Sequence, residues 1–269
     1  MKRLAGLLVA GLIVVGGTFG SASAAPTDGD VGVNALTDVS AYVIGSGIYT
    51  AHNDFAGQAL NAYDPIGGPI CNGQGTHTAS VIGGMVYGEA FGVRLRGVRV
   101  GDCGLGPGLM TGISWTTNNA VHPALAHIPI VGSVNAALDA AVTNMVASGV
   151  VTVVPAGDSN ADACSFSPAR AFPAITVGSS TNTNVKSSFS NFGTCVDVYA
   201  RGQSVTAAWN GSPTATATLS GTSVAAADVA GCVAKDLGIN MTATPAQVHS
   251  WVIANAPLVG GIRIFTCPL

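Results

Sequence analysis

Two side chains with the chemistry of nucleophilic catalysis stand at the starts of expected helices. Ser223 begins an Ala- and Val-rich helix expected over 223–237, and His77 lies at the start of a short helix expected over 76–85. A serine hydroxyl is a weak nucleophile until a neighbouring histidine removes its proton. The two residues are therefore candidates for one site. The alternatives are that Ser223 only caps its helix and that His77 has no role.

The elements that would position these residues alternate along the chain. The pattern predicts strands over 41–44, 94–100, 125–131, 150–154, 174–177, 196–199 and 262–265, and helices over 76–85, 110–120, 133–148, 223–237 and 245–254. Such alternation favours an α/β fold with a mainly parallel central sheet and helices on both faces. In that fold, strand carboxyl ends and helix amino ends meet at one edge, where chemistry is found.

Composition narrows the class of protein. The 269 residues are 48 % apolar and only 9 % charged, with a formal net charge of −3. A chain of this length and apolar content buries a substantial core and is not disordered. Without a basic patch, nucleic acid is excluded as an expected partner. We expect a single folded domain and a monomer.

The amino terminus predicts export. Lys2 and Arg3 precede an apolar stretch over 4–19, and small residues over 21–24 offer a cleavage site. We expect a signal peptide over 1–24, a short lead-in over 25–35 and the folded domain over 36–269. The mature protein would be extracellular, or periplasmic in a host with an outer membrane, and free of the membrane. The alternative is an uncleaved anchor helix.

Six cysteines fit an exported protein. An even number of cysteines in an oxidising compartment favours disulfides. The chain has no Cys-x-x-Cys pair, which argues against a zinc site. Fifteen pairings are possible, so the count alone does not choose among them; free buried cysteines are the alternative. The cysteines are Cys71, Cys103, Cys164, Cys195, Cys232 and Cys267.

Four short segments together resemble one enzyme family. They are AYVIGSGI (41–48), GTHTA (75–79), SSFSNFG (187–193) and GTSVA (221–225). The first, second and fourth segments are similar to the aspartate, histidine and serine motifs of the subtilisin-like serine peptidases, or subtilases, and occur in the same order. The third segment resembles a stretch that lies between the histidine and serine motifs in that family. The likeness runs from about residue 36 to the carboxyl terminus and is closest to the proteinase K-like and aqualysin-like branch. It implies a subtilisin-like domain that acts on peptides or proteins, with His77 and Ser223 in hydrogen-bond reach.

The resemblance also implies stabilising features. It pairs Cys71 with Cys103 and Cys164 with Cys195, which leaves Cys232 for Cys267. Asp197, with nearby backbone carbonyls, resembles one calcium site of the branch, and oxygen ligands suit calcium. An ordinary exposed aspartate is the alternative. We expect no required cofactor and at most a structural calcium.

Several positions depart from the family pattern in ways that affect catalysis. Gly45 stands where the catalytic aspartate is usual, and Gln74 stands where a histidine usually precedes Gly75-Thr76-His77. Asp158 replaces the usual oxyanion asparagine, and an ionised carboxylate cannot donate a hydrogen bond to an oxyanion.

The expected substrate-binding edge is altered as well. Pro129, Ile130, Val131 and Gly132 replace the usual Ser-Leu-Gly-Gly; the proline lacks a backbone donor, and the valine adds a side chain. We therefore expect a secreted subtilase-family protein that resembles an endopeptidase but is inactive or strongly impaired. The alternative is a pseudopeptidase that serves as a peptide- or protein-binding module.

Overall fold

The computed structural model describes residues 36–102 and 106–268. The chain divides into two compact units, Met1–Asp30 and Val31–Leu269, and the fold described below belongs to the second. The predicted signal peptide and lead-in lie outside the described residues and stay predictions. Across the part that is described, no helix is both long and apolar enough to cross a membrane.

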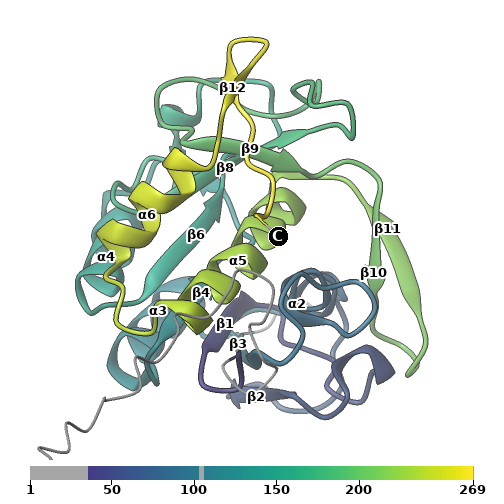
Figure 1. The fold of residues 1–269 in the computed structure, drawn as a ribbon. Helices are drawn as coiled ribbons and strands as arrows, with labels where there is room; N and C mark the ends of the chain where they lie inside the picture. The colour runs from purple at the N-terminus through teal and green to yellow at the C-terminus, as the bar shows by residue number, and fades with distance from the viewer. Residues whose placement is uncertain (1–35, 103–105, 269) are drawn as a thin grey trace, which may run out of the picture. The chain divides into compact units, whose positions relative to one another are not determined.

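Seven parallel strands form the central sheet, in the order β2-β3-β1-β4-β6-β8-β9 (Figure 1). Their bounds are β1 Ser40–Gly45, β2 Ala59–Tyr63, β3 Arg94–Arg99, β4 Ala124–His127, β6 Val151–Pro155, β8 Ile175–Ser180 and β9 Val198–Arg201. The predicted α/β class with a parallel sheet is confirmed.

Helices cover both faces of this sheet. They are α2 Gln74–Gly83, α3 Leu109–Asn119, α4 Ala136–Ala147, α5 Thr222–Ile239 and α6 Pro245–Ala254, with the 3-10 turns η1 Asn53–Phe55 and η2 Ala163–Ser165. Side chains alternate along β1, as the pleat requires. Ala41 and Val43 join the core under α2, α5 and α6, whereas Tyr42 and Ile44 join the core under α3 and α4.

Short antiparallel pairs complete the fold. They are β10 Val205–Ala208 with β11 Thr216–Leu219, β5 Gly132–Ser133 with β7 Phe166–Ser167, and β12 Leu258–Val259 with β13 Ile262–Arg263. Most predicted boundaries shift by a few residues, and two predicted strands differ more clearly from the structure. The strand expected over 125–131 ends at His127, because Pro129 cannot donate to a sheet. The strand expected over 262–265 is shorter and belongs to a hairpin, with only a bridge from Ile264 to Tyr199.

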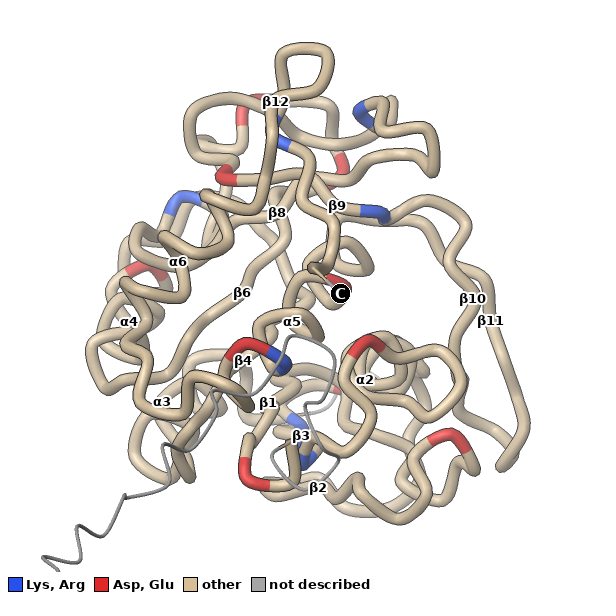
Figure 2. The backbone as a smooth tube through the Cα atoms, in the orientation of Figure 1, with Lys and Arg blue, Asp and Glu red and all other residues tan. Residues whose placement is uncertain are grey.

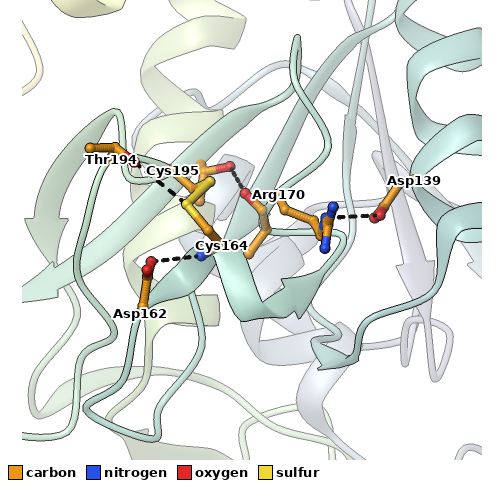
Figure 3. Close-up of a disulfide and its surroundings, with 8 residues drawn as sticks. Asp139, Asp162, Cys164, Arg170, Thr194 and Cys195 are labelled. Carbon is orange, nitrogen blue, oxygen red and sulfur yellow. Dashed lines mark hydrogen bonds and ion pairs between the residues drawn. A yellow bond between two sulfur atoms is a disulfide. The ribbon is translucent and has the colours of Figure 1, made fainter.

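Disulfides join segments that are distant in sequence, as predicted. Cys164 is bonded to Cys195 and Cys232 to Cys267. Cys71 is also disulfide-bonded, but Cys103 lies outside the described residues, so that pairing stays a prediction. Figure 3 shows the surroundings of the first bridge, where the Asp162 side chain accepts the Cys164 N–H at 3.0 Å.

Charged residues are few and scattered over the chain (Figure 2). One buried pair helps to position the site. Arg99 lies 2.6 Å from Asp102, and both are almost fully buried. The two Asp102 oxygens accept the N–H groups of Cys71 and Asn72 at 2.8 and 2.9 Å. Because these residues immediately precede α2, the ion pair fixes where that helix begins.

Candidate active-site cleft

A cleft of about 460 Å³ opens where the carboxyl ends of β4 and β6 meet the amino ends of α2 and α5. Its walls combine apolar and polar side chains with one carboxylate. The lining residues are Gln74, Pro129, Ile130, Val131, Gly132, Ser133, Pro155, Gly157, Asp158, Ser159, Phe166, Thr222 and Ser223. This is the edge where the sequence pattern predicted the chemistry.

Ser223 is the second residue of α5 and is half-buried in this cleft. Two hydrogen bonds fix the helix start that carries it. The Gly157 N–H donates to Thr222 Oγ1 at 3.0 Å, and the Thr222 N–H donates to Asp158 Oδ1 at 2.7 Å. Asp158 therefore caps α5 from the loop after β6, and a carboxylate at a helix amino end is favoured by the helix dipole.

Asn191 holds the loop that carries Asp158. Its Oδ1 accepts the N–H groups of Ser159 and Ala161, each at 3.0 Å, and its Nδ2 donates to Ala156 O at 2.8 Å. Asn191 belongs to the SSFSNFG segment picked out from the sequence. Its role in the structure is to brace the cleft wall rather than to line the cleft.

His77 does not join Ser223, which corrects the prediction that the two lie within hydrogen-bond reach. Its side chain is fully buried, and its Nε2 donates to the Val205 carbonyl of β10 at 3.1 Å. Trp209 packs edge-on against the ring. Burial lowers the pKa of His77, against the opposing effect of the Val205 and Ala217 carbonyls, so the neutral imidazole is favoured.

Gln74, not His77, is the α2 residue that lines the cleft with Ser223. It is the first residue of α2, whereas His77 lies three residues further on, about 4.5 Å along the helix axis. Gln74 Nε2 donates to the Pro129 carbonyl at 3.3 Å. Sequence reasoning noted Gln74 as a substitution but assigned the histidine role to position 77.

Gly75 explains why this end of α2 lies so close to the loop that follows Gly45. A Cβ atom at position 75 would collide with the Gly47 carbonyl oxygen, so only glycine permits the approach. The Gly75 N–H also donates to Ser46 Oγ at 3.0 Å. The loop after β1 and the start of α2 are thus locked together beside the cleft.

Gly45 supplies no carboxylate, and nearby aspartates do not replace it. His77 Nδ1 has no hydrogen-bond partner within the described part of the chain. Asp54 instead accepts the Ser80 hydroxyl at 2.6 Å and the Val86 N–H at 2.7 Å. Asp38 forms a surface ion pair with Arg94 at 3.4 Å. Neither carboxylate is available to orient a histidine.

The predicted substrate-binding edge does border the cleft. Pro129, Ile130, Val131 and Gly132 all line it. Val131 packs against the small apolar cluster beneath the floor, with a methyl group 3.2 Å from where a Cβ on Gly157 would stand. Around Gly132 the space is open, because a Cβ atom at that position would have no neighbour within 4 Å.

Comparison with known proteins places these features in a family. A profile described as the subtilase family matches residues 6–264. This chain belongs to the subtilase family. The subtilase is 47 % identical over 233 residues to the "Extracellular serine proteinase" of Thermus sp. (strain Rt41A), covering 84 % of this chain and 57 % of that protein.

Further relatives agree. The subtilase is 44 % identical over 227 residues to "Alkaline serine exoprotease A" of Vibrio alginolyticus, covering 82 % of this chain and 42 % of that protein. It therefore spans about half the length of these two relatives. A crystal structure of a cold adapted subtilisin-like serine proteinase matches with a TM-score of 0.82 and 39 % identity, over 86 % of this chain and 89 % of that one.

The residues around Asp197 do not fit the calcium that the family resemblance implies. Asp197 Oδ2 accepts the Thr176 N–H at 2.8 Å, and Oδ1 lies 3.3 Å from His249 Nε2 on α6. Both carboxylate oxygens are thus engaged, one of them by an imidazole. The hydrogen bond to the Asp197 carboxylate raises the pKa of His249, whereas burial lowers it. The net rise favours the charged imidazolium. Among the described residues, Asp197 belongs to no group of three or more His, Cys, Asp or Glu side chains that could hold a metal ion.

Proposed function

We propose that this subtilase binds extended peptides in the Ser223 cleft and that its peptidase activity is absent or strongly impaired. One observation carries the proposal: among the described residues, those that line the cleft include Ser223 but no histidine. Gln74 is the α2 residue that shares this cleft with Ser223, and a serine nucleophile needs a general base there. A neutral amide does not accept a proton at physiological pH, so the Ser223 hydroxyl stays un-ionised.

Two other departures act on separate parts of the same mechanism. Gly45 provides no carboxylate to orient a base or to stabilise its protonated form. Asp158 accepts the Thr222 N–H and, when ionised, repels negative charge on a reacting carbonyl oxygen. In a subtilisin, removing the whole catalytic triad lowers kcat by about 2 × 10⁶. A loss of similar size is the expectation here.

Peptide binding is supported by what the cleft retains. An extended peptide binds to an exposed backbone edge through main-chain hydrogen bonds. The edge from Ile130 to Ser133 borders the cleft and is largely exposed, and Gly132 leaves room for a second backbone. The two relatives compared above are described as a serine proteinase and a serine exoprotease, and proteases act on polypeptides. Secretion, predicted from the amino terminus, would place such a ligand outside the cell.

A serine-directed phosphonate probe tests the loss of activity. Wild-type protein is expected to remain unlabelled under conditions in which an active subtilase is labelled completely. The Ser223→Ala variant is the matched control for labelling elsewhere. Complete labelling of wild type that disappears in Ser223→Ala would refute the impairment and support the other candidate, a working endopeptidase.

A further inference from the structure

We infer that the cleft selects peptides with a basic side chain, because Asp158 gives it a negative charge that no cationic side chain of the described residues pairs with. This inference rests on the proposed peptide binding. Within residues 36–102 and 106–268, Asp158 is the one charged residue that lines the cleft, and no lysine, arginine or histidine lines it. In the described part of the chain, Asp158 forms no ion pair. The residue is exposed, so a ligand can reach it.

The free oxygen of Asp158 lies on the same side as Ser223. Oδ1 is occupied by the Thr222 N–H at 2.7 Å. Oδ2 lies 3.3 Å, and Ser223 Oγ 3.4 Å, from the point where a Cβ on Gly221 would stand. Since residue 221 is glycine, its own side chain does not fill the space between these two oxygens. An acceptor-only carboxylate oxygen there favours a ligand group that donates and carries positive charge.

The helix dipole offsets only part of this charge. The amino end of α5 is equivalent to roughly half a positive charge, so about half a negative charge remains at the cleft. A peptide carbonyl oxygen pointed at Asp158 would be repelled, whereas an ammonium or guanidinium group would be attracted. The substitution that harms oxyanion stabilisation therefore has a positive consequence for binding.

The walls suit the stem of a basic side chain. Ile130, Val131, Pro155 and Phe166 present apolar surface around the carboxylate. Lysine and arginine bury their methylene stems against apolar surface and keep the charged end near a polar partner. An acidic side chain would meet the Asp158 charge, and an aliphatic one would leave Oδ2 without a donor. The geometry thus ranks basic above aliphatic above acidic.

A set of capped hexapeptides tests this ranking. The peptides acetyl-Ala-Ala-Pro-X-Ala-Ala-amide carry lysine, norleucine or glutamate at X, and their Kd values are measured by calorimetry at low ionic strength. Wild type is expected to bind the lysine peptide about fivefold more tightly than the norleucine peptide, the size expected for a partly exposed charge pair. Added salt should reduce that difference.

Asp158→Asn is the decisive variant, because the amide oxygen can still accept the Thr222 N–H while the charge is lost. The lysine preference should disappear in Asp158→Asn and persist in Asp38→Asn, which removes a carboxylate outside the cleft. Equal binding of the lysine and norleucine peptides by wild type would overturn the inference and leave peptide binding intact. A lysine preference that survives in Asp158→Asn would also overturn it. If no peptide binds, the proposed binding function itself fails.

Discussion

At the scale of single residues, the difference between positions 74 and 77 decides what the cleft can do. The GTHTA segment suggested a histidine base, but α2 places residue 74 in the cleft that Ser223 lines and buries residue 77 against β10. The His77 ring has a structural task, since its Nε2 satisfies the Val205 carbonyl. Its burial explains why a histidine in a family motif has no contact with the nucleophile.

His77→Phe tests this structural role. The aromatic packing against Trp209 is kept, but the Val205 carbonyl loses its donor. An unpaired buried acceptor costs about 1–3 kcal/mol, so thermal unfolding should show a lower Tm. Any residual phosphonate labelling that depends on Ser223 should stay unchanged. Loss of that labelling in a folded His77→Phe variant would mean that His77 acts as the base after all.

A second residue, Asp228 on α5, predicts a pH-dependent stability. Burial, with a smaller contribution from Glu89, raises the pKa of Asp228 to about 7, against the opposing effects of Arg201 and Lys235. An unfolded aspartate has a pKa of about 4. Because the folded-state pKa is higher, the contribution of this carboxyl to stability is fully present below pH ~4 and is lost as the pH rises through the folded-state pKa.

Stability measured by urea unfolding should therefore fall between about pH 4 and pH 8. The expected contribution from Asp228 is on the order of 2 kcal/mol, because the side chain is only partly buried. Asp228→Asn should flatten this part of the profile and should be more stable than wild type at about pH 8, whereas Asp38→Asn should leave it unchanged. Identical profiles for wild type and Asp228→Asn would contradict the assignment.

At the scale of elements, a contact between α6 and the sheet engages the carboxylate that the family resemblance suggested as a calcium ligand. Asp197 precedes β9 and is joined to His249 on α6 and to the backbone of β8. The sequence indicated the aspartate but not its partner, because His249 is 52 residues away and belongs to no motif. Only folding brings the imidazole to the carboxylate.

Neither added calcium nor a chelator should therefore change the Tm of the wild-type protein measurably. A ligand that binds only the folded state raises Tm, so a response to calcium would reveal a site. His249→Ala should lower Tm because Asp197 loses a partner, and the freed carboxylate should make this variant more sensitive to calcium than wild type. A fall in the wild-type Tm on adding chelator would restore the calcium site.

The elements themselves were largely predictable. Buried β-branched runs such as 150–154 and amphipathic segments such as 133–148 have periodicities that local sequence reveals. By contrast, β2 and the β10–β11 hairpin were missed. The hairpin is rich in alanine and threonine and partly exposed, so its own pattern is a weak strand signal. The Ala208 N–H of β10 donates to Ser80 Oγ on α2 at 3.1 Å, a contact that local sequence does not reveal.

At the scale of the whole molecule, a subtilisin-like fold surrounds the cleft that holds Ser223. The parallel sheet, the Cys164–Cys195 and Cys232–Cys267 disulfides and the helix that carries Ser223 are all present. The family motifs revealed these features, and they identified Gly45 and Asp158 as departures. They did not reveal which α2 residue faces the cleft, because that depends on where the helix begins. The Arg99–Asp102 pair sets this start through Cys71 and Asn72.

Restoring the three altered positions together tests the central claim most directly. In Gly45→Asp/Gln74→His/Asp158→Asn, a base, its carboxylate and an oxyanion donor would face Ser223. A Cβ at position 45 would contact Pro129 Cγ at 3.4 Å, an ordinary packing distance, so the aspartate can be accommodated. The measurement is kcat/KM on a long peptide, with folding checked by Tm and the same triple variant carrying Ser223→Ala as the control.

The triple variant should cleave at least about 100-fold faster than wild type, since each restored group contributes about that much or more. The Gly45→Asp variant alone should remain inert. Position 74 is still a glutamine in that variant, so the new aspartate has no histidine base to orient. The activity of the triple variant should vanish with Ser223→Ala. A folded triple variant that binds the peptide but stays inert, or a wild type that already cleaves at an ordinary subtilase rate through Ser223, would contradict the account.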